Sequence, residues 1–184
     1  MSEELLVKQC SPTLAGLKTG NLFSCPAEEY GALCRKIRQM NVRLVPRGIR
    51  ILPLRCRDGR ALIYMYRPKY LQRDLSLSLA QEILQSKEYP VENAPRCIAE
   101  LIRRLQMKDK FPHEIGLFLG YPPEDVKGFI ENEAQSAKCV GTWKVYGDEE
   151  SAKRKFAQYQ SCSRLYWSCF CKTRSLESLI VANQ

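Results

Sequence analysis

The sequence predicts a mixed α/β (α+β) fold, in which helices cover a mixed sheet that contains one antiparallel hairpin. Two observations support this prediction. Asp58-Gly59 separates two strand-like runs, residues 49–57 and 60–67, and this dipeptide is the strongest short hairpin signal. Strand-like and helix-like segments also interleave in the order βα, ββ, αα, βα, βα, α. With 184 residues, the chain is expected to form a single domain, 1–184, with a C-terminal helical tail over about residues 162–184.

The first expected elements are a strand and a helix. A strand is expected at Asn21–Phe23. Ser24-Cys25-Pro26 then indicates a helix start, because proline is favoured at the first helical position. Leu33, Ile37 and Met40 recur at helical spacing and give this helix an apolar side.

A two-residue turn at Asp58-Gly59 determines which hairpin residues face each other. Arg57 then lies opposite Arg60, and Cys56 lies opposite Ala61. The side expected to face the core carries Cys56, Ala61, Leu54, Ile63, Leu52 and Met65. The opposite side mixes arginines with tyrosines and carries Arg57, Arg60, Arg55, Leu62, Pro53, Tyr64, Ile51 and Tyr66.

Helices and two strand–helix units are expected in the rest of the chain. One helix covers about residues 71–86, and another begins after Asn93-Ala94-Pro95. Strands are expected at residues 115–120 and 140–146, each followed by a helix with acidic residues at its start. The second of these helices is capped by Asp148 and runs through Phe156 and Tyr159.

The positive charge is concentrated in one region. The net charge is +9, yet residues 35–73 hold twelve basic residues and a single acid, Asp58, which gives that segment +11. Guanidinium groups bind phosphates with two hydrogen bonds, and tyrosine rings stack on bases. The hairpin therefore predicts an anion-binding surface for a phosphate-bearing ligand, a nucleic acid or an acidic protein. Its residues are Arg55, Arg57, Arg60, Tyr64 and Tyr66. The alternative is a solvated strand face, or one covered by an acidic helix.

A cysteine at a helix start is the second candidate site. Unpaired N–H groups and the helix dipole would stabilise the Cys25 thiolate, which nucleophilic catalysis requires. His113 is the only histidine and is the candidate base. The alternative is a capping or surface histidine, because nothing in the sequence brings the two residues together.

Strand ends give a third candidate, a possible ligand edge. Cys25, Tyr121 and Tyr146 each end a predicted strand that leads into a helix, so parallel strands would bring them to one edge of the sheet. Lys18 and Thr19 lie between Gly16 and Gly20 in a loop that resembles a phosphate loop without the Walker spacing. The alternative is that these glycines only permit turns.

The nine cysteines do not predict a metal site. Cys169 and Cys171, with Cys139 and Cys162, offer four thiols, but the two-residue spacer of zinc and iron–sulfur sites is missing. No export signal and no run of membrane-spanning length is evident, so a cytoplasmic protein with reduced thiols and no membrane span is expected. The sequence does not identify a cofactor.

Three segments resemble a bacterial domain-of-unknown-function family, number three-seven-nine-three. They are Thr13–Phe23, Phe111–Phe129 and Gly141–Tyr146, and the resemblance covers nearly the whole chain. It implies a compact bacterial protein, typical of anaerobes and associated with flavodoxin and iron-uptake gene neighbourhoods. It implies no activity.

Three functional hypotheses follow. The favoured one is a non-catalytic binding or accessory protein that recognises an anionic ligand or partner. The first alternative is a thiol-dependent enzyme that uses Cys25, and the second is a redox or iron accessory protein. The sequence does not decide whether the protein is an enzyme.

Overall fold

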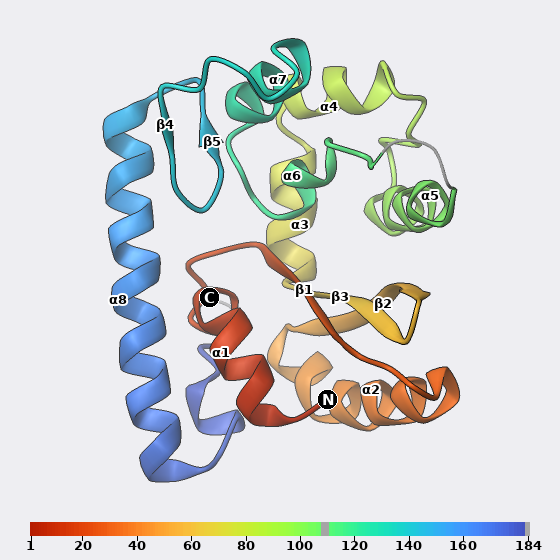
Figure 1. The fold of residues 1–184 in the computed structure, drawn as a ribbon, viewed down its shortest axis with the longest axis vertical. Helices are drawn as coiled ribbons and strands as arrows, with labels where there is room; N and C mark the ends of the chain where they lie inside the picture. Colours follow the sequence, from red (N-terminus) through yellow and green to blue (C-terminus); the bar gives the residue numbers. More distant parts are fainter. Residues whose placement is uncertain (108–110, 183–184) are drawn as a thin grey trace. The chain divides into compact units, whose positions relative to one another are not determined.

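The computed structural model describes residues 1–107 and 111–182, and Figure 1 shows their helices and strands. The chain divides into two compact units. The first unit comprises residues 1–69 and 159–184, and the second comprises residues 70–158. The predicted mixed α/β class is confirmed, and both sheets in the described residues are antiparallel.

The first unit contains a three-stranded sheet. Its strands are β1 (Gly20–Pro26), β2 (Arg50–Arg57) and β3 (Arg60–Tyr66), and β3 lies in the centre. The predicted hairpin is confirmed, because Arg57 pairs with Arg60 across the turn. Asp58 and Gly59 have φ angles of 51° and 69°, the left-handed conformation that a two-residue type I′ turn requires.

A β-bulge at Leu54 corrects the predicted register of the hairpin. The pairs nearest the turn are as expected, but Pro53 rather than Leu54 lies opposite Ile63. The extra residue moves the inner half of β2 by one position and exchanges its two faces. Ile51 therefore belongs to the core, and Leu52 lies on the opposite face with Tyr64.

Helices α1 (Glu3–Leu14) and α2 (Tyr30–Leu44) pack on the core face of this sheet, and a short η1 helix (Val45–Arg47) follows α2. The Ser2 side chain caps α1 by accepting a hydrogen bond from the Leu5 amide. The predicted helix start at Cys25 is wrong, because β1 runs through Pro26 and α2 begins only at Tyr30. The core includes Leu6, Val7, Cys10, Leu14, Phe23, Leu33, Ile37, Ile51, Ile63 and Met65.

Arg67 joins three parts of the first unit. Its buried guanidinium donates hydrogen bonds to the carbonyls of Thr13, Leu14 and Val181, at 2.7, 2.7 and 2.8 Å. Two of these carbonyls lie at the end of α1, where helical carbonyls lack internal partners and the helix dipole favours a cation. The Val181 amide in turn donates to the Leu14 carbonyl. The guanidinium thus fixes the C-terminal segment against α1.

The second unit is mainly helical. It contains α3 (Pro68–Leu75), which begins at the boundary of the first unit, α4 (Ser78–Gln85), α5 (Ala94–Gln106), α6 (Ile115–Phe118) and α7 (Pro123–Glu131). The single helix expected at residues 71–86 is divided, since the extended backbone of Leu77 starts α4 as a new helix. The helix after Asn93 is confirmed. The Asn93 side chain caps it by accepting a hydrogen bond from the Arg96 amide.

Both later strand predictions are corrected. Residues 115–118 form the buried helix α6 rather than a strand, and Gly120, with a φ angle of 75°, ends this turn. Residues 139–145 form a tight hairpin of β4 (Cys139–Val140) and β5 (Lys144–Val145) instead of one strand.

The last long helix, α8 (Glu149–Thr173), is continuous where the sequence suggested two helices, and a short η2 helix (Glu177–Leu179) follows it. The predicted cap is present, because Oδ1 of Asp148 accepts a hydrogen bond from the Ser151 amide. Among the described residues, no helix is both long and apolar enough to cross a membrane.

Candidate functional site

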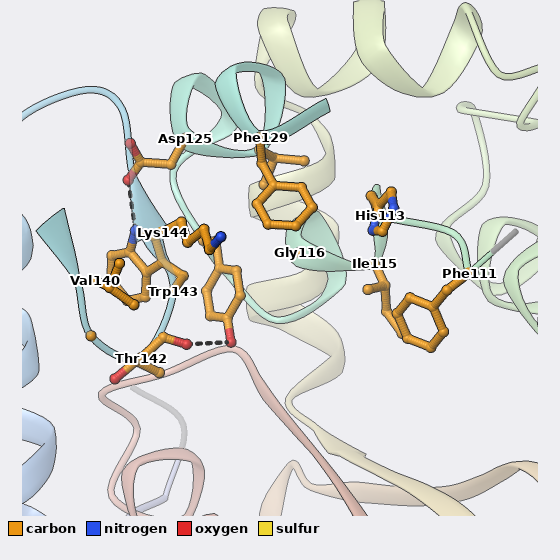
Figure 2. Close-up of a pocket in the computed structure, with 13 residues that line it drawn as sticks. Phe111, His113, Ile115, Gly116, Asp125, Phe129, Val140, Thr142, Trp143 and Lys144 are labelled. Atoms are coloured by element: carbon orange, nitrogen blue, oxygen red, sulfur yellow. Dashed lines mark hydrogen bonds between the residues drawn. The ribbon is translucent and has the colours of Figure 1, made fainter. Parts of the chain in front are cut away.

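The second unit contains a cavity of about 340 Å³ lined mainly by aromatic and aliphatic side chains. Helices α6 and α7 form one part of its wall, and the β4–β5 hairpin forms another (Figure 2). Its lining consists of Phe111, His113, Ile115, Gly116, Tyr121, Asp125, Val126, Phe129, Val140, Gly141, Thr142, Trp143 and Lys144.

Trp143 is the central ring of the hairpin wall. The Tyr121 ring stacks on it at a centroid distance of 4.9 Å, and the Phe156 ring of α8 meets it edge-on at 4.6 Å. The Tyr121 hydroxyl also donates to the Thr142 carbonyl at 3.3 Å. These contacts hold the hairpin against the turn between α6 and α7, so this wall has a defined shape.

Asp125 fixes the hairpin to the first turn of α7. Its Oδ2 accepts a hydrogen bond from Nε1 of Trp143 at 2.6 Å, as Figure 2 shows. Its Oδ1 accepts from the amides of Tyr146 and Gly147, both at 2.7 Å. The carboxylate is buried, and its position in the first helical turn also favours negative charge. Both oxygens of the only acidic side chain in the lining therefore accept hydrogen bonds from this segment.

Two glycines make room for this packing. A Cβ at Gly141 would overlap the Phe156 ring, and a Cβ at Gly128 would approach the Tyr146 ring to 2.5 Å. Both distances are shorter than real Cβ contacts, so side chains there would displace the rings. The segments 111–129 and 141–146 are thus distinctive because their glycines and rings fit together around the cavity.

The cavity has a cationic side. The Lys144 ammonium donates to the Ala134 carbonyl at 2.8 Å and lies 6.0 Å from the centroid of the Phe129 ring. The His113 ring is tilted against the Phe129 ring at 5.0 Å. In Figure 2, the Lys144 nitrogen and the Phe129 ring point into the space between the hairpin and His113.

A buried polar cluster supports the segment that carries His113. The Tyr89 hydroxyl donates to Oε1 of Glu114 at 2.9 Å, and the Arg104 guanidinium lies over the Tyr89 ring at 4.6 Å. Burial, together with the neighbouring Glu114 carboxylate, raises the pKa of Tyr89. The phenol therefore stays protonated as a hydrogen-bond donor, and the cluster anchors the start of α6 to α5.

The structure separates the predicted Cys25–His113 pair between the two units. Cys25 lies inside β1 in the first unit and is only 1% exposed, whereas His113 belongs to the second unit. Burial raises the pKa of the Cys25 thiol. The predicted activation by a helix N-terminus is therefore wrong, because a strand carries this cysteine and burial disfavours its thiolate.

The arginines and the tyrosines of the predicted binding surface differ in their exposure to solvent. Arg57 and Arg60 are exposed at the tip of the β2–β3 hairpin, and Arg55 is half-buried on the same face. Tyr64 and Tyr66 are buried and stack on each other at 4.7 Å. Their rings are therefore not open to solvent, as a base-stacking platform would require. Anion binding by the arginines stays a prediction.

The predicted ligand edge does not form from parallel strands. Tyr121 follows a helical turn and lines the cavity, whereas Tyr146 packs over Gly128 and donates through its hydroxyl to the Gln135 carbonyl. Lys18 and Thr19 are buried between α1 and β1 in the first unit. Burial lowers the pKa of Lys18 to about 8. These residues therefore belong to separate local structures.

The described residues contain no group of three or more His, Cys, Asp or Glu side chains placed to hold a metal ion. Cys139 lies in the second unit, and Cys162, Cys169 and Cys171 lie in the first. Sequence reasoning missed the cavity residues Asp125, Phe129, Trp143 and Lys144. The available signal was the Gly-Thr-Trp-Lys-Val-Tyr run, in which a glycine, an indole, a lysine and a tyrosine fall within six residues.

Comparison with known proteins gives a family without an assigned activity. The family described as "Protein of unknown function (DUF3793)" matches residues 6–180. No curated protein and no solved structure matches the chain.

Proposed function

Since the chain belongs to the DUF3793 family, whose description gives no function, we propose a function from the cavity itself. The protein is a non-catalytic binding protein that holds a small organic anion with a flat, apolar body. This proposal narrows the anionic-ligand hypothesis drawn from the sequence. The observation that carries it is the combination, in one cavity, of aromatic walls, a carboxylate that accepts three hydrogen bonds and an ammonium group.

The size and lining of the cavity support a small, flat ligand. Ligand pockets in proteins occupy roughly 300–1,000 Å³ and are lined mostly by apolar and aromatic side chains. The volume of about 340 Å³ lies at the small end of that range. The Phe129 ring lies in the lining, and π-faces stack favourably on other flat, apolar rings.

The polar groups of the lining favour a negative charge on the ligand. An ammonium group has three donors, and Lys144 uses one of them for the Ala134 carbonyl. Asp125 is the only acid in the lining, and both of its oxygens accept hydrogen bonds from the Trp143 indole and the amides of Tyr146 and Gly147. A carboxylate or sulfonate on the ligand would therefore meet a cation in an apolar setting, where charge-assisted hydrogen bonds are strong.

Binding is proposed rather than catalysis because the polar side chains mainly build the walls. Asp125 holds the β4–β5 hairpin, the Tyr121 hydroxyl donates to Thr142, and Lys144 donates to Ala134. Groups fixed in this way give a binding site its shape. General acid–base catalysis instead requires a group within hydrogen-bond reach of the reacting proton.

A fluorescent aromatic anion tests the proposal. The Trp167→Phe variant leaves Trp143 as the only tryptophan. Anilinonaphthalene sulfonate carries a flat, apolar body and one negative charge, and phenylnaphthylamine is its neutral counterpart. We expect saturable energy transfer from Trp143 to both probes, with tighter binding of the sulfonate.

Replacing Lys144 should separate the two probes. In a Lys144→Gln variant, the affinity for the sulfonate should fall about tenfold or more, since a hydrogen bond to a charged group contributes about 1.5–3 kcal/mol. The affinity for the neutral probe should not change. Lys127→Gln, which removes an exposed lysine of α7, is the matched control. No transfer from Trp143, or equal losses for both probes, would reject the proposal.

A further inference from the structure

We propose that the tip of the β2–β3 hairpin in the first unit binds the phosphate backbone of a nucleic-acid strand. This site is separate from the cavity of the second unit. It is defined by Arg55, Arg57 and Arg60, which we call the arginine tip. The inference does not depend on the proposed ligand of the cavity.

Three cations of the basic segment have structural roles. Arg67 is buried against three carbonyls, and Arg43 pairs with Glu3 and Glu177. Arg47 donates to the Glu177 carbonyl. These three cations hold the first unit together, and none of them belongs to the hairpin tip.

Strand pairing places like charges opposite each other at this tip. Arg57 and Arg60 form a directly opposed pair in the β2–β3 ladder, so their Cβ atoms are about 4.5–5.5 Å apart. Opposed like charges destabilise a ladder. A bound anion would relieve this repulsion, because each guanidinium presents several donors in a planar fork that suits phosphate oxygens.

Arg57 and Arg60 each make one local contact at the tip. Nε of Arg60 donates to the Ser24 hydroxyl at 3.0 Å, and the side chain is exposed. Nε of Arg57 lies 3.4 Å from Asp58, but Asp58 is 87% exposed, and such surface pairs contribute little. Arg55 shares this face, because it pairs with Leu62 in the same row as Ser24.

Helix α2 carries further exposed cations in the first unit. Strand β1 ends at Pro26, opposite Arg60, and α2 begins only four residues later at Tyr30. Figure 1 shows the start of α2 close to the β2–β3 turn. Lys36 and Arg38 are exposed in the second and third turns of α2. The acids Glu28 and Glu29 lie just before the helix, and Glu29 pairs with Arg35.

A partner with regularly repeated negative charge fits cations that lie on both a hairpin and a helix. A nucleic-acid strand carries a phosphate at every nucleotide, whereas proteins offer comparable charge only in long acidic runs. Because Tyr64 and Tyr66 are buried, the tip offers phosphate contacts without base stacking. The binding is therefore expected to be independent of sequence and strongly dependent on salt.

Fluorescence anisotropy with a labelled oligothymidylate tests the site. Wild-type protein should bind. The logarithm of its binding constant should fall linearly with the logarithm of the salt concentration between about 50 and 200 mM salt. The Arg55→Gln/Arg57→Gln/Arg60→Gln variant should lose about tenfold or more in affinity at the lower salt concentration. Its salt slope should fall by about 2, since each single-strand phosphate contact contributes roughly 0.7.

A variant with matched charge provides the control. Lys153→Gln/Arg154→Gln/Lys155→Gln removes the same three charges from an exposed part of α8, so it should keep most of the affinity. Equal losses in both variants would overturn the proposal. So would displacement of the oligonucleotide by polyglutamate at equal charge concentration. Arg57→Gln alone changes one exposed side chain and should lower the slope by about 0.7 even if the triple variant unfolds.

Discussion

The indole Nε1 of Trp143 donates a hydrogen bond to Oδ2 of Asp125 at 2.6 Å, and both side chains are buried. The bond connects the β4–β5 hairpin to the first turn of α7. Two backbone amides complete the shell around the same carboxylate. The wall of the cavity therefore depends on one negative charge with three donors.

We expect Asp125→Asn to destabilise the second unit by about 2–4 kcal/mol. The asparagine amide has the size of the carboxylate, but its NH₂ group would face at least one of the three N–H donors. Urea unfolding followed by near-ultraviolet circular dichroism of Trp143 in a Trp167→Phe background measures this loss. Glu131→Gln, an exposed change on α7, is the control and should stay within about 0.5 kcal/mol. A loss of the same small size for Asp125→Asn would contradict the central role of this carboxylate.

We expect Gly141→Ala to cost about 1–3 kcal/mol, because the added Cβ overlaps the Phe156 ring. Phe156→Leu should relieve the overlap, so the double variant should be more stable than the sum of the two single losses predicts. Thermal or urea unfolding of the four proteins in this cycle gives the coupling energy. Strictly additive losses would show that the ring does not restrict residue 141.

We expect Arg67→Met to destabilise the first unit by about 3 kcal/mol or more, since it removes the guanidinium that donates to the carbonyls of Thr13, Leu14 and Val181, the first two of them buried at the end of α1. Hydrogen exchange at the Val181 amide should accelerate more than exchange in the sheet, because that amide lies next to the lost guanidinium. Arg67→Lys should recover only part of the stability, since an ammonium lacks the planar fork. Lys172→Met on the exposed side of α8 is the control. Unchanged exchange at Val181 would count against the anchoring role.

We expect Lys18 to make the unfolding free energy rise with pH between about 8 and 10.5. Burial lowers its pKa from 10.5 to about 8, so in this range the unfolded chain binds more protons than the folded chain. The gain would reach about 3 kcal/mol above this range. Denaturant unfolding at several pH values, compared with Lys18→Met, isolates this effect from the tyrosines and cysteines. Parallel pH profiles for the two proteins would contradict it.

We expect Cys25 to alkylate far more slowly than Cys56 at neutral pH. Cys25 is buried and burial raises the pKa of its thiol, whereas Cys56 is exposed near the hairpin tip. Iodoacetamide labelling followed by peptide mass spectrometry measures both rates in one sample. Faster labelling of Cys25 would restore the thiol-enzyme hypothesis.

Local signals predicted the elements whose geometry is determined within a few residues. Asp58-Gly59 determined a turn because both residues accept positive φ angles, and Asn93 and Asp148 predicted helix starts through their side-chain caps. Ser2, followed by two glutamates, carries the same kind of signal for α1. Propensity alone was insufficient for residues 115–120, where an apolar run of this length suits a strand or a buried helix equally.

The cavity could not be predicted because it depends on contacts between elements. Trp143 and Asp125 are 18 positions apart, and no local pattern places an indole on a carboxylate at that separation. Cys25 shows the opposite error. Its Ser-Cys-Pro setting suits a helix start, but pairing of β1 with β3 continues through Pro26, and tertiary structure overrides the local preference.

The bulge at Leu54 indicates where the length of this chain can vary. Leu54 has no partner in the ladder, and the pairs on either side of it are complete. A relative that lacks this residue would keep every other pair of the hairpin and would lose only one buried side chain. A deletion anywhere else in β2 would exchange inward-facing and outward-facing residues. Single-residue gaps among related sequences are therefore expected to concentrate at this position of the strand.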